Sequence, residues 1–178
     1  MLEGINKINI IGGMGTGKTT LANHISKELK IPVCYMDALN YGANWKIKNQ
    51  KKRDKKILQK IKEASWIMDG TYLSTLENRL KAGDLTIYLD YSTWAQLKGS
   101  VGRYLKNHGK EKPEVPGCKD KMTLSFLLWI FRWKRHNRKQ IIEMINKTDQ
   151  NKIVILKNRK QLNEWYKDSF DKEIEIKK

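Results

Sequence analysis

The sequence predicts an α/β fold, in which five parallel strands form one sheet and helices cover both of its faces. Three observations support this prediction. Short apolar runs recur along the chain, segments with helical spacing of apolar residues separate them, and a glycine-rich turn joins the first run to the first helical segment. Strands that alternate with helices form parallel sheets, and such sheets bind ligands at the carboxyl ends of their strands.

Five apolar runs are the predicted strands. The first ends at the glycine-rich turn, the second follows Pro32, and the third and fourth are followed by Asp69 and Asp90. Continuous apolar runs are typical of strands that are buried on both faces. The predicted strands are residues 7–11, 33–36, 65–68, 85–89 and 152–156.

Six segments are predicted helices, because their apolar residues recur at intervals of three and four positions. In the first, Leu21, Ala22, Ile25 and Leu29 fall on one helical face. In the second, Ile57, Leu58 and Ile61 are expected to face inward. The predicted helices are residues 18–29, 53–64, 73–82, 94–105, 124–145 and 159–170.

One segment, residues 107–121, does not fit a tight connection. It contains two prolines, two glycines and many charges. A loop of this length inside a compact domain is usually a lid or a disordered insert. We expect a lid over about residues 106–122.

Length and composition indicate one globular domain over residues 1–178, with 39% hydrophobic and 31% charged residues. The longest unbroken apolar run, residues 126–131, is far shorter than the roughly 20 residues that span a bilayer. No leader pattern is visible at the N-terminus. We therefore expect a cytoplasmic protein without membrane contact, in which Cys34 and Cys118 are free thiols.

The net charge is +17, from 36 basic and 19 acidic residues. Such an excess is typical of proteins that bind nucleic acid. Most of it is lysine spread along the whole chain, however, and an anionic nucleotide substrate would also account for it. Nucleic acid is therefore the less favoured partner, and the sequence does not indicate an oligomeric state.

The turn after the first predicted strand, GGMGTGKT, matches the pattern G-x-x-x-x-G-K-[ST] between a strand and a helix. Glycines let successive N–H groups point at phosphate oxygens, and the helix N-terminus adds its positive end. Lys18 is expected to reach the β- and γ-phosphates of ATP, and the Thr19 hydroxyl to bind Mg²⁺. The expected nucleotide-binding residues of this loop are Gly12, Gly13, Met14, Gly15, Thr16, Gly17, Lys18, Thr19 and Thr20.

Several segments together resemble known families. SWIMDGTY and LTIYLDYSTWAQLKGSVGRYL are similar to a strand end and to a strand and helix of nucleoside-monophosphate-kinase-like P-loop NTPases. MDALNYGANW, WIMDGTY, GRYLKNHGKEKPEVPGC and LLWIFRWKRHNR together resemble the adenylate-kinase-related family of DNA topology modulation proteins (FlaR-like). The resemblance covers nearly the whole chain. It implies a P-loop kinase-like fold with an acceptor-side segment at about residues 37–64 and a lid.

Three aspartates follow predicted strands. Asp69 is the expected Mg²⁺ ligand, with a plain Asp-Gly turn as the alternative and Asp90 as the second candidate. The resemblance implies that Asp37 binds the acceptor or takes its proton, although a helix N-cap fits it equally well. Tyr41 and Trp45 could stack on a flat acceptor, but core packing better fits each of them alone.

Arginines around the lid are candidates for stabilising the transferred phosphoryl group. Arg103 lies just before the lid, where the resemblance implies a lid arginine. Arg135 and Arg138 share a helix face after the lid, and Arg132 extends this stripe; a solvated basic face is the alternative. Adenylate kinases commonly have a further arginine at the position of Gly99, so the chain departs from their pattern there.

Two further basic features could bind anions or bases. Arg159, next to Asn158, follows the last strand where this fold places the adenine, and it could stack on the base. Residues 46–62 contain nine basic residues and one acid. They could attract a phosphorylated acceptor or nucleic acid, although a solvated amphipathic helix fits them better.

The sequence thus predicts an ATP- and Mg²⁺-dependent phosphotransferase. Its acceptor is a small molecule: a nucleotide, a nucleoside or another hydroxyl metabolite. The expected catalytic residues are Lys18, Asp37, Arg103, Arg135 and Arg138, and the expected metal ligands are Thr19 and Asp69. The alternatives are a nucleotide-regulated DNA- or RNA-binding protein that affects DNA topology, and a simple NTPase, against which the lid and its arginines argue.

Overall fold

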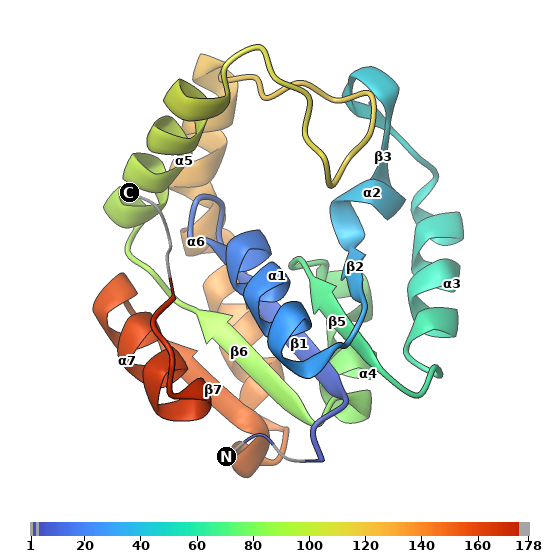
Figure 1. The fold of residues 1–178 in the computed structure, drawn as a ribbon. Coiled ribbons are helices and arrows are strands. Elements are labelled where there is room, and N and C mark those ends of the chain that lie inside the picture. Colours follow the sequence, from blue (N-terminus) through green and yellow to red (C-terminus); the bar gives the residue numbers. More distant parts are fainter. Residues whose placement is uncertain (1, 3, 175–178) are drawn as a thin grey trace.

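Five parallel strands form the central sheet of the protein, as a computed structural model shows for residues 2 and 4–174 (Figure 1). The strand order is β2-β5-β1-β6-β7. This order confirms the predicted fold class, and it places β5 and β6 on either side of β1. The strands are β1 (Lys7–Gly12), β2 (Val33–Tyr35), β5 (Trp66–Asp69), β6 (Leu85–Leu89) and β7 (Ile153–Leu156).

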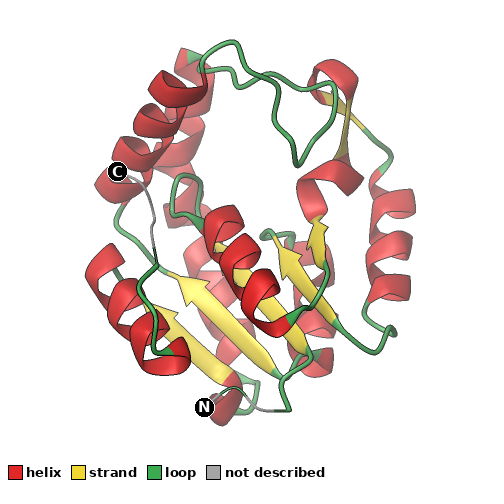
Figure 2. Ribbon diagram, viewed as in Figure 1, coloured by secondary structure: helices red, strands yellow, loops and turns green. Residues whose placement is uncertain are grey.

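Helices cover both faces of the sheet (Figure 2). Ile8 and Ile10 of β1 contact the core that α1 (Lys18–Leu29) and α7 (Arg159–Phe170) close on one face. Ile11 contacts a second core on the other face, where α4 (Leu73–Ala82) and α6 (Leu124–Asn146) lie. This alternation follows from the two-residue period of a strand.

A smaller unit, made of two helices and a separate ribbon, lies beside the edge of the sheet that β2 forms. Helices α2 (Met36–Asn40) and α3 (Gln50–Lys60) contribute Met36 and Ile57 to a third core, which also contains Trp66 and Met68 of β5. Between these helices lies a two-stranded antiparallel ribbon, which we call the acceptor-side ribbon. It consists of β3 (Tyr41–Gly42), the 3₁₀ turn η1 (Ala43–Trp45) and β4 (Lys46–Ile47).

The sequence did not predict α2 or the acceptor-side ribbon. Both are too short to show a periodic apolar pattern. Asn44 and Trp45 also have positive φ angles of 56° and 62°, a conformation uncommon for residues other than glycine. Nothing in the order of apolar and polar residues indicates such a turn.

Some predicted boundaries were wrong. Helix α3 begins three residues before the predicted start, because the Asn49 side chain accepts a hydrogen bond from the Lys52 N–H at 3.0 Å and caps the helix. Helix α5 (Thr93–Asn107) begins after Ser92, which caps it in the same way. Strand β2 ends at Tyr35 because Met36 starts α2. The short 3₁₀ turn η2 (Gln150–Lys152) precedes β7. The predicted helices 18–29, 73–82 and 159–170 are confirmed at both ends.

The segment predicted as a lid, at about residues 106–122, corresponds to residues 108–123 between α5 and α6, hereafter called the α5–α6 loop. It crosses above the carboxyl edge of the sheet to the acceptor-side ribbon (Figure 1). Glu111 pairs with Lys119 as an isolated β-bridge, and Val115 and Cys118 are buried. The loop is therefore held by specific contacts.

Backbone and thiol contacts join the α5–α6 loop to the acceptor-side ribbon. The Asn44 N–H donates to the Gly117 carbonyl at 2.8 Å, and the Cys118 thiol donates to the Gly42 carbonyl at 3.1 Å. Trp45 Nε1 donates to the Lys119 carbonyl at 2.7 Å. Cys34 and Cys118 are free, as predicted. Within residues 2 and 4–174, no helix is both long enough and apolar enough to cross a membrane.

Candidate active site

The glycine-rich loop lies between the end of β1 at Gly12 and the start of α1 at Lys18. Gly15 and Gly17 have φ angles of 67° and 92°, in the region that favours glycine. The Thr16 hydroxyl donates to the Gly13 carbonyl at 2.9 Å and closes the turn. Thr71, after β5, accepts from the Gly12 N–H at 2.8 Å and donates to the Gly12 carbonyl at 2.9 Å.

This loop presents backbone donors to the carboxyl edge of the sheet. In the part of the chain that the structure describes, the N–H groups of residues 13–20 donate to no protein acceptor, and the first hydrogen bond of α1 runs from Leu21 to Gly17. Free N–H groups at a helix N-terminus form an anion site, aided by the helix dipole. The loop therefore fits phosphate groups, as the sequence predicts.

Lys18 folds back over the loop. Its Nζ donates to the Gly13 carbonyl at 2.6 Å. Burial lowers the pKa of Lys18, and the carboxylates of Asp69 and Asp37 oppose that shift. A half-buried cation held against a phosphate-binding loop is suited to contact a phosphate without intervening water.

Thr19 and Asp69 come together from α1 and β5. The Thr19 hydroxyl donates to Asp69 Oδ2 at 2.6 Å. Burial raises the pKa of Asp69 to about 6, against the opposing effects of Lys18 and the Thr19 hydrogen bond. A hydroxyl and a carboxylate oxygen are ligands that Mg²⁺ accepts when water and phosphates complete its shell. These two side chains therefore fit the metal that the sequence predicts.

Asp90, the second metal candidate, is used differently. Arg138 Nε contacts its Oδ2 at 2.9 Å, and Lys134 Nζ contacts its Oδ1 at 3.0 Å. Asp90 thus ties α6 to the end of β6, whereas Asp69 lies beside Thr19. The geometry favours Asp69 for the metal.

Asp37 lies in the first turn of α2. Its charge acts on the pKa values of both Lys18 and Asp69. The N-cap of α2 is Tyr35, so the N-cap alternative for Asp37 was wrong. Tyr72, which sequence reasoning missed, donates its hydroxyl to Asp37 Oδ1 at 2.7 Å.

Two cations approach the phosphate loop from α5 and the α5–α6 loop. The charges of Arg103 and Lys112 both lower the pKa of Lys18, which places them within electrostatic range of it. Arg103 Nε donates to Asp120 Oδ2 at 3.1 Å. Lys112 was not predicted, because nothing distinguishes it in sequence from the other lysines of its segment.

The rings of Tyr41 and Trp45 pack edge to face, with their centroids 5.3 Å apart. Trp45 also lies under Lys112, whose Nζ is 5.3 Å from the ring centroid. The ring and its Nε1 hydrogen bond to Lys119 therefore link the acceptor-side ribbon to the α5–α6 loop. Stacking of Trp45 on an acceptor has no support in these contacts.

The arginines of α6 have different surroundings. Arg138 is paired with Asp90, and its side chain is 46% exposed. Arg135 and Arg132 are exposed and line a shallow hollow with Leu128, Phe131 and His136. The contacts thus bring Arg138, but not Arg135, to the end of a central strand.

Arg159 is the first residue of α7, after its N-cap Asn158. Burial raises the pKa of Tyr91 to about 12, and the Arg159 charge opposes that shift. Arg159 therefore lies near the residues that follow β6. Its predicted contact with adenine stays a prediction.

Helix α5 touches the phosphate loop at Gly99. A Cβ on Gly99 would lie 2.0 Å from the Gly15 carbonyl oxygen. No side chain fits at this position, so the arginine of the adenylate-kinase pattern has no room here. Gln96 and Ser100 of the same helix are buried against Gly13 and Gly15.

Arg79 of α4 is a buried arginine that sequence reasoning missed. It donates to the Gly70 carbonyl at 3.1 Å and to the Tyr72 carbonyl at 3.3 Å. Burial lowers the pKa of Arg79 to about 10. Its contacts hold the turn that carries Thr71 and Tyr72, and no pattern in the sequence separates it from a surface arginine.

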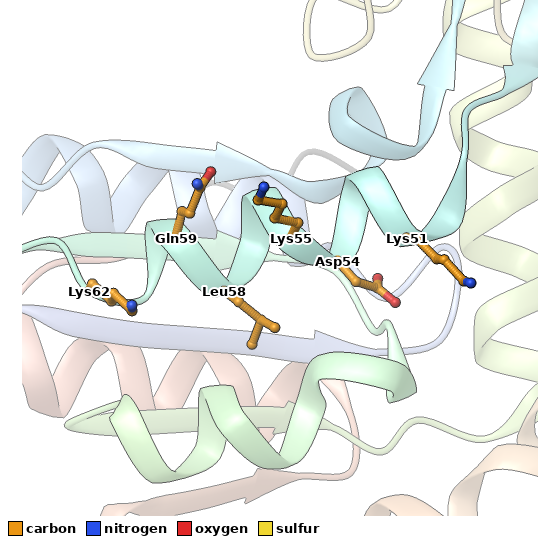
Figure 3. A pocket seen from close by; sticks show the side chains of 6 residues that line it. All are labelled: Lys51, Asp54, Lys55, Leu58, Gln59 and Lys62. Carbon is orange, nitrogen blue, oxygen red and sulfur yellow. The ribbon is translucent and has the colours of Figure 1, made fainter.

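The basic residues of α3 lie mostly on its exposed face. Figure 3 shows a shallow hollow along this helix. Ile57 is fully buried, whereas Leu58 is 37% exposed and does not face inward as predicted. The arrangement matches the solvated amphipathic helix that the sequence favours. The hollow is lined by Lys51, Asp54, Lys55, Leu58, Gln59 and Lys62.

Part of the sequence matches a family of nucleotide-binding proteins. Residues 8–70 match the family described as "ATPase family associated with various cellular activities (AAA)". This segment runs from β1 to the residue after Asp69 and contains the whole glycine-rich loop. The match covers about a third of the chain, and it supports a P-loop nucleotide-binding core. Among curated proteins, none matches this chain.

Solved structures of small P-loop kinases share the fold. Shikimate kinase from Acinetobacter baumannii, in complex with shikimate, is 16% identical with a TM-score of 0.58, over 99% of this chain and 98% of that chain. A gluconokinase from Sinorhizobium meliloti 1021 is 14% identical with a TM-score of 0.51, over 93% and 90%. A sugar kinase from Janibacter sp. HTCC2649 is 15% identical with a TM-score of 0.52, over 94% and 95%. The chain therefore has the P-loop kinase fold over nearly its whole length.

Proposed function

We propose that this protein is an ATP-dependent phosphotransferase that acts on a small molecule. The observation that carries the proposal is the Thr19–Asp69 hydrogen bond beside Lys18, with Asp37 in electrostatic range of both charged groups. In this proposal, the groups that bind the phosphates, the metal and the acceptor meet at one edge of the sheet. The fold shared with shikimate kinase and gluconokinase supports this assignment.

Each group has a role in this proposal. The loop N–H groups and Lys18 hold the phosphates, and Thr19 and Asp69 hold the metal. Bound Mg²⁺ supplies charge neutralisation at the phosphates. Asp37 orients the acceptor hydroxyl and accepts its proton, while the acceptor oxygen bonds to the γ-phosphorus and the bond from that phosphorus to the β,γ-bridging oxygen breaks. The products are ADP and a phosphomonoester.

The α5–α6 loop would close the site. In this proposal it excludes water, so that ATP is not hydrolysed in place of transfer. Arg103 and Lys112 would then neutralise the transferred group. Arg138 requires release from Asp90 to reach that group, and Arg135 requires a larger rearrangement.

The test is ADP release with ATP and Mg²⁺, in the presence and absence of nucleosides, nucleoside monophosphates and small hydroxyl metabolites. Acceleration by one class of compound, lost in Lys18→Ala, is the expected result. Lys27→Ala, at the end of the same helix, is the matched control and should behave as the wild type. Slow ADP release that no compound accelerates would instead indicate a simple NTPase.

A second candidate is a nucleotide-regulated protein that binds DNA or RNA through its basic surface. The exposed lysines of α3 favour it; two of them, Lys51 and Lys55, line the hollow of this helix (Figure 3). Binding to duplex DNA that changes with ATP and weakens steeply with salt would support this candidate.

A further inference from the structure

Asp37 lies in a cluster with two phenols. Tyr72 donates its hydroxyl to Asp37, and Tyr41 is close enough that the Asp37 charge adds to the effect of burial in raising its pKa. Burial and Asp37 raise the pKa of Tyr72 as well. Both phenols therefore stay protonated at neutral pH. A carboxylate flanked by hydroxyls matches a substrate hydroxyl, which donates one hydrogen bond and accepts another.

Arg53 is the cation that contacts this cluster. It is 8% exposed, and its guanidinium lies 4.6 Å from the Tyr72 ring centroid. One terminal nitrogen donates to Asn40 Oδ1 at 2.7 Å, and the other donates to Ser74 Oγ at 3.1 Å. Arg53 is thus held in place on several sides by neutral partners.

Asp54 neutralises Arg53. Nε and a terminal nitrogen of Arg53 both lie close to Asp54 Oδ1, at 2.8 Å and 2.7 Å. These are the donors that a guanidinium uses to bind a phosphate or carboxylate bidentately. An anionic acceptor that used these donors of Arg53 would have to displace Asp54 and leave that carboxylate, whose side chain is only 20% exposed, beside a second negative charge.

The other cations of this region are directed elsewhere. Lys48 Nζ donates to the Ala38 carbonyl at 2.8 Å. Lys51, Lys55 and Lys62 line the exposed hollow of α3 (Figure 3). Arg103 donates to Asp120, and Lys112 lies over the Trp45 ring, so neither of these cations is directed at Asp37. Within residues 2 and 4–174, no unpaired cation contacts Asp37 or the Tyr72 hydroxyl.

Resting on the phosphotransferase function above, we propose that the acceptor is an uncharged polyhydroxy compound, a nucleoside or a neutral sugar, whose reacting hydroxyl contacts Asp37 and Tyr72. Nucleoside monophosphates and hydroxy acids are disfavoured, because Asp54 already occupies the anion-binding side of Arg53. The Arg53–Asp54 pair is thereby a specificity determinant for acceptor charge.

The test measures acceptor binding calorimetrically, with Mg²⁺ and a non-hydrolysable ATP analogue present. The ligands are matched pairs: adenosine with AMP, and glucose with gluconate. A neutral member should bind at least about tenfold more tightly than its charged partner. Tighter binding of a charged member overturns the proposal, as does binding of no neutral member when the ATP analogue binds. This experiment measures binding without transfer. If a neutral ligand binds but the protein releases no ADP when that ligand is supplied with ATP, the phosphotransferase function is contradicted and the acceptor class stands.

A variant separates the role of Asp54 from general electrostatics. Asp54→Asn frees Arg53 and should shift the ratio of charged to neutral affinity about tenfold toward the charged member. Glu63→Gln, which removes the partner of Lys60 just after α3, is the matched control and should leave the ratio unchanged. An unchanged ratio in folded Asp54→Asn, judged by circular dichroism, overturns the proposed role of the pair.

Discussion

Gly99 of α5 and Gly15 of the phosphate loop are in direct contact, so close that a Cβ on Gly99 would lie 2.0 Å from the Gly15 carbonyl oxygen. Helix α5 therefore packs directly against the glycine-rich loop and stabilises its conformation. Only glycine at position 99 allows the two backbones to come this close. The same contact leaves no room for the arginine that adenylate kinases commonly have at this position.

Gly99→Ala should displace the loop. The clash is between backbone and side chain, so it is relieved only by moving the helix or the loop, which typically costs about 1–3 kcal/mol. We expect a lower melting temperature and about tenfold weaker ATP binding, measured by thermal denaturation and by nucleotide titration.

Gly102→Ala is the control for this prediction. Gly102 lies in the same helix, and a Cβ there meets nothing within 4 Å. This substitution should raise stability by about 0.5–1 kcal/mol and leave ATP binding unchanged. Equal melting temperatures and equal ATP affinities of the two variants would contradict the proposed packing role of Gly99.

The raised pKa of Asp69, about 6, predicts a pH dependence. Asp69 binds a proton more readily in the folded state than in the unfolded state, where the pKa of an aspartate is near 3.9. Asp69 therefore contributes stability below about pH 4 that is lost as pH rises through about 6. The free energy of unfolding of the wild type, relative to Asp69→Asn, should fall over this window without nucleotide.

Metal binding should depend on the same proton in the opposite direction. Mg²⁺ requires the carboxylate, so its affinity in the presence of ATP should weaken as pH falls below about 6. Asp69→Asn should bind Mg²⁺ weakly at all pH values. Asp168→Asn, at an exposed position of α7, should follow the wild type in both measurements.

The position of the glycine-rich loop between a strand and a helix was predictable from sequence because the residues of the loop are contiguous. Lys18 and Thr19 belong to one motif, and Asp69 ends a strand whose neighbour in the sheet carries that motif. The acceptor side was not predictable in the same way. The partners of Arg53 and Trp45 depend on short elements and on contacts between distant segments, such as Trp45 with Lys119, and local apolar periodicity carries no information about them.

Trp45→Phe should loosen the α5–α6 loop. The substitution keeps an aromatic ring but removes the 2.7 Å hydrogen bond from Nε1 to the Lys119 carbonyl. Loss of about 1 kcal/mol would raise the open population of the loop about fivefold. Limited proteolysis within residues 108–123 should accelerate accordingly. Trp94→Phe, at a site that is 76% exposed, should not change the cleavage rate; equal acceleration there would contradict the prediction.

Arg138 and Arg135 should differ in their effect on catalysis. Arg138 contacts Asp90 at the carboxyl end of β6, whereas Arg135 is exposed in the outer hollow of α6. If Arg138 moves from Asp90 to the transferred phosphoryl group, Arg138→Ala should lower kcat by about 10- to 100-fold and change the Kd for ATP little, because the contact forms only in the transition state. Arg135→Ala should lower kcat much less.

Steady-state kinetics and ATP titration of both variants provide the measurement. Parallel losses of binding and turnover in Arg138→Ala would mean that Arg138 only anchors α6 through Asp90.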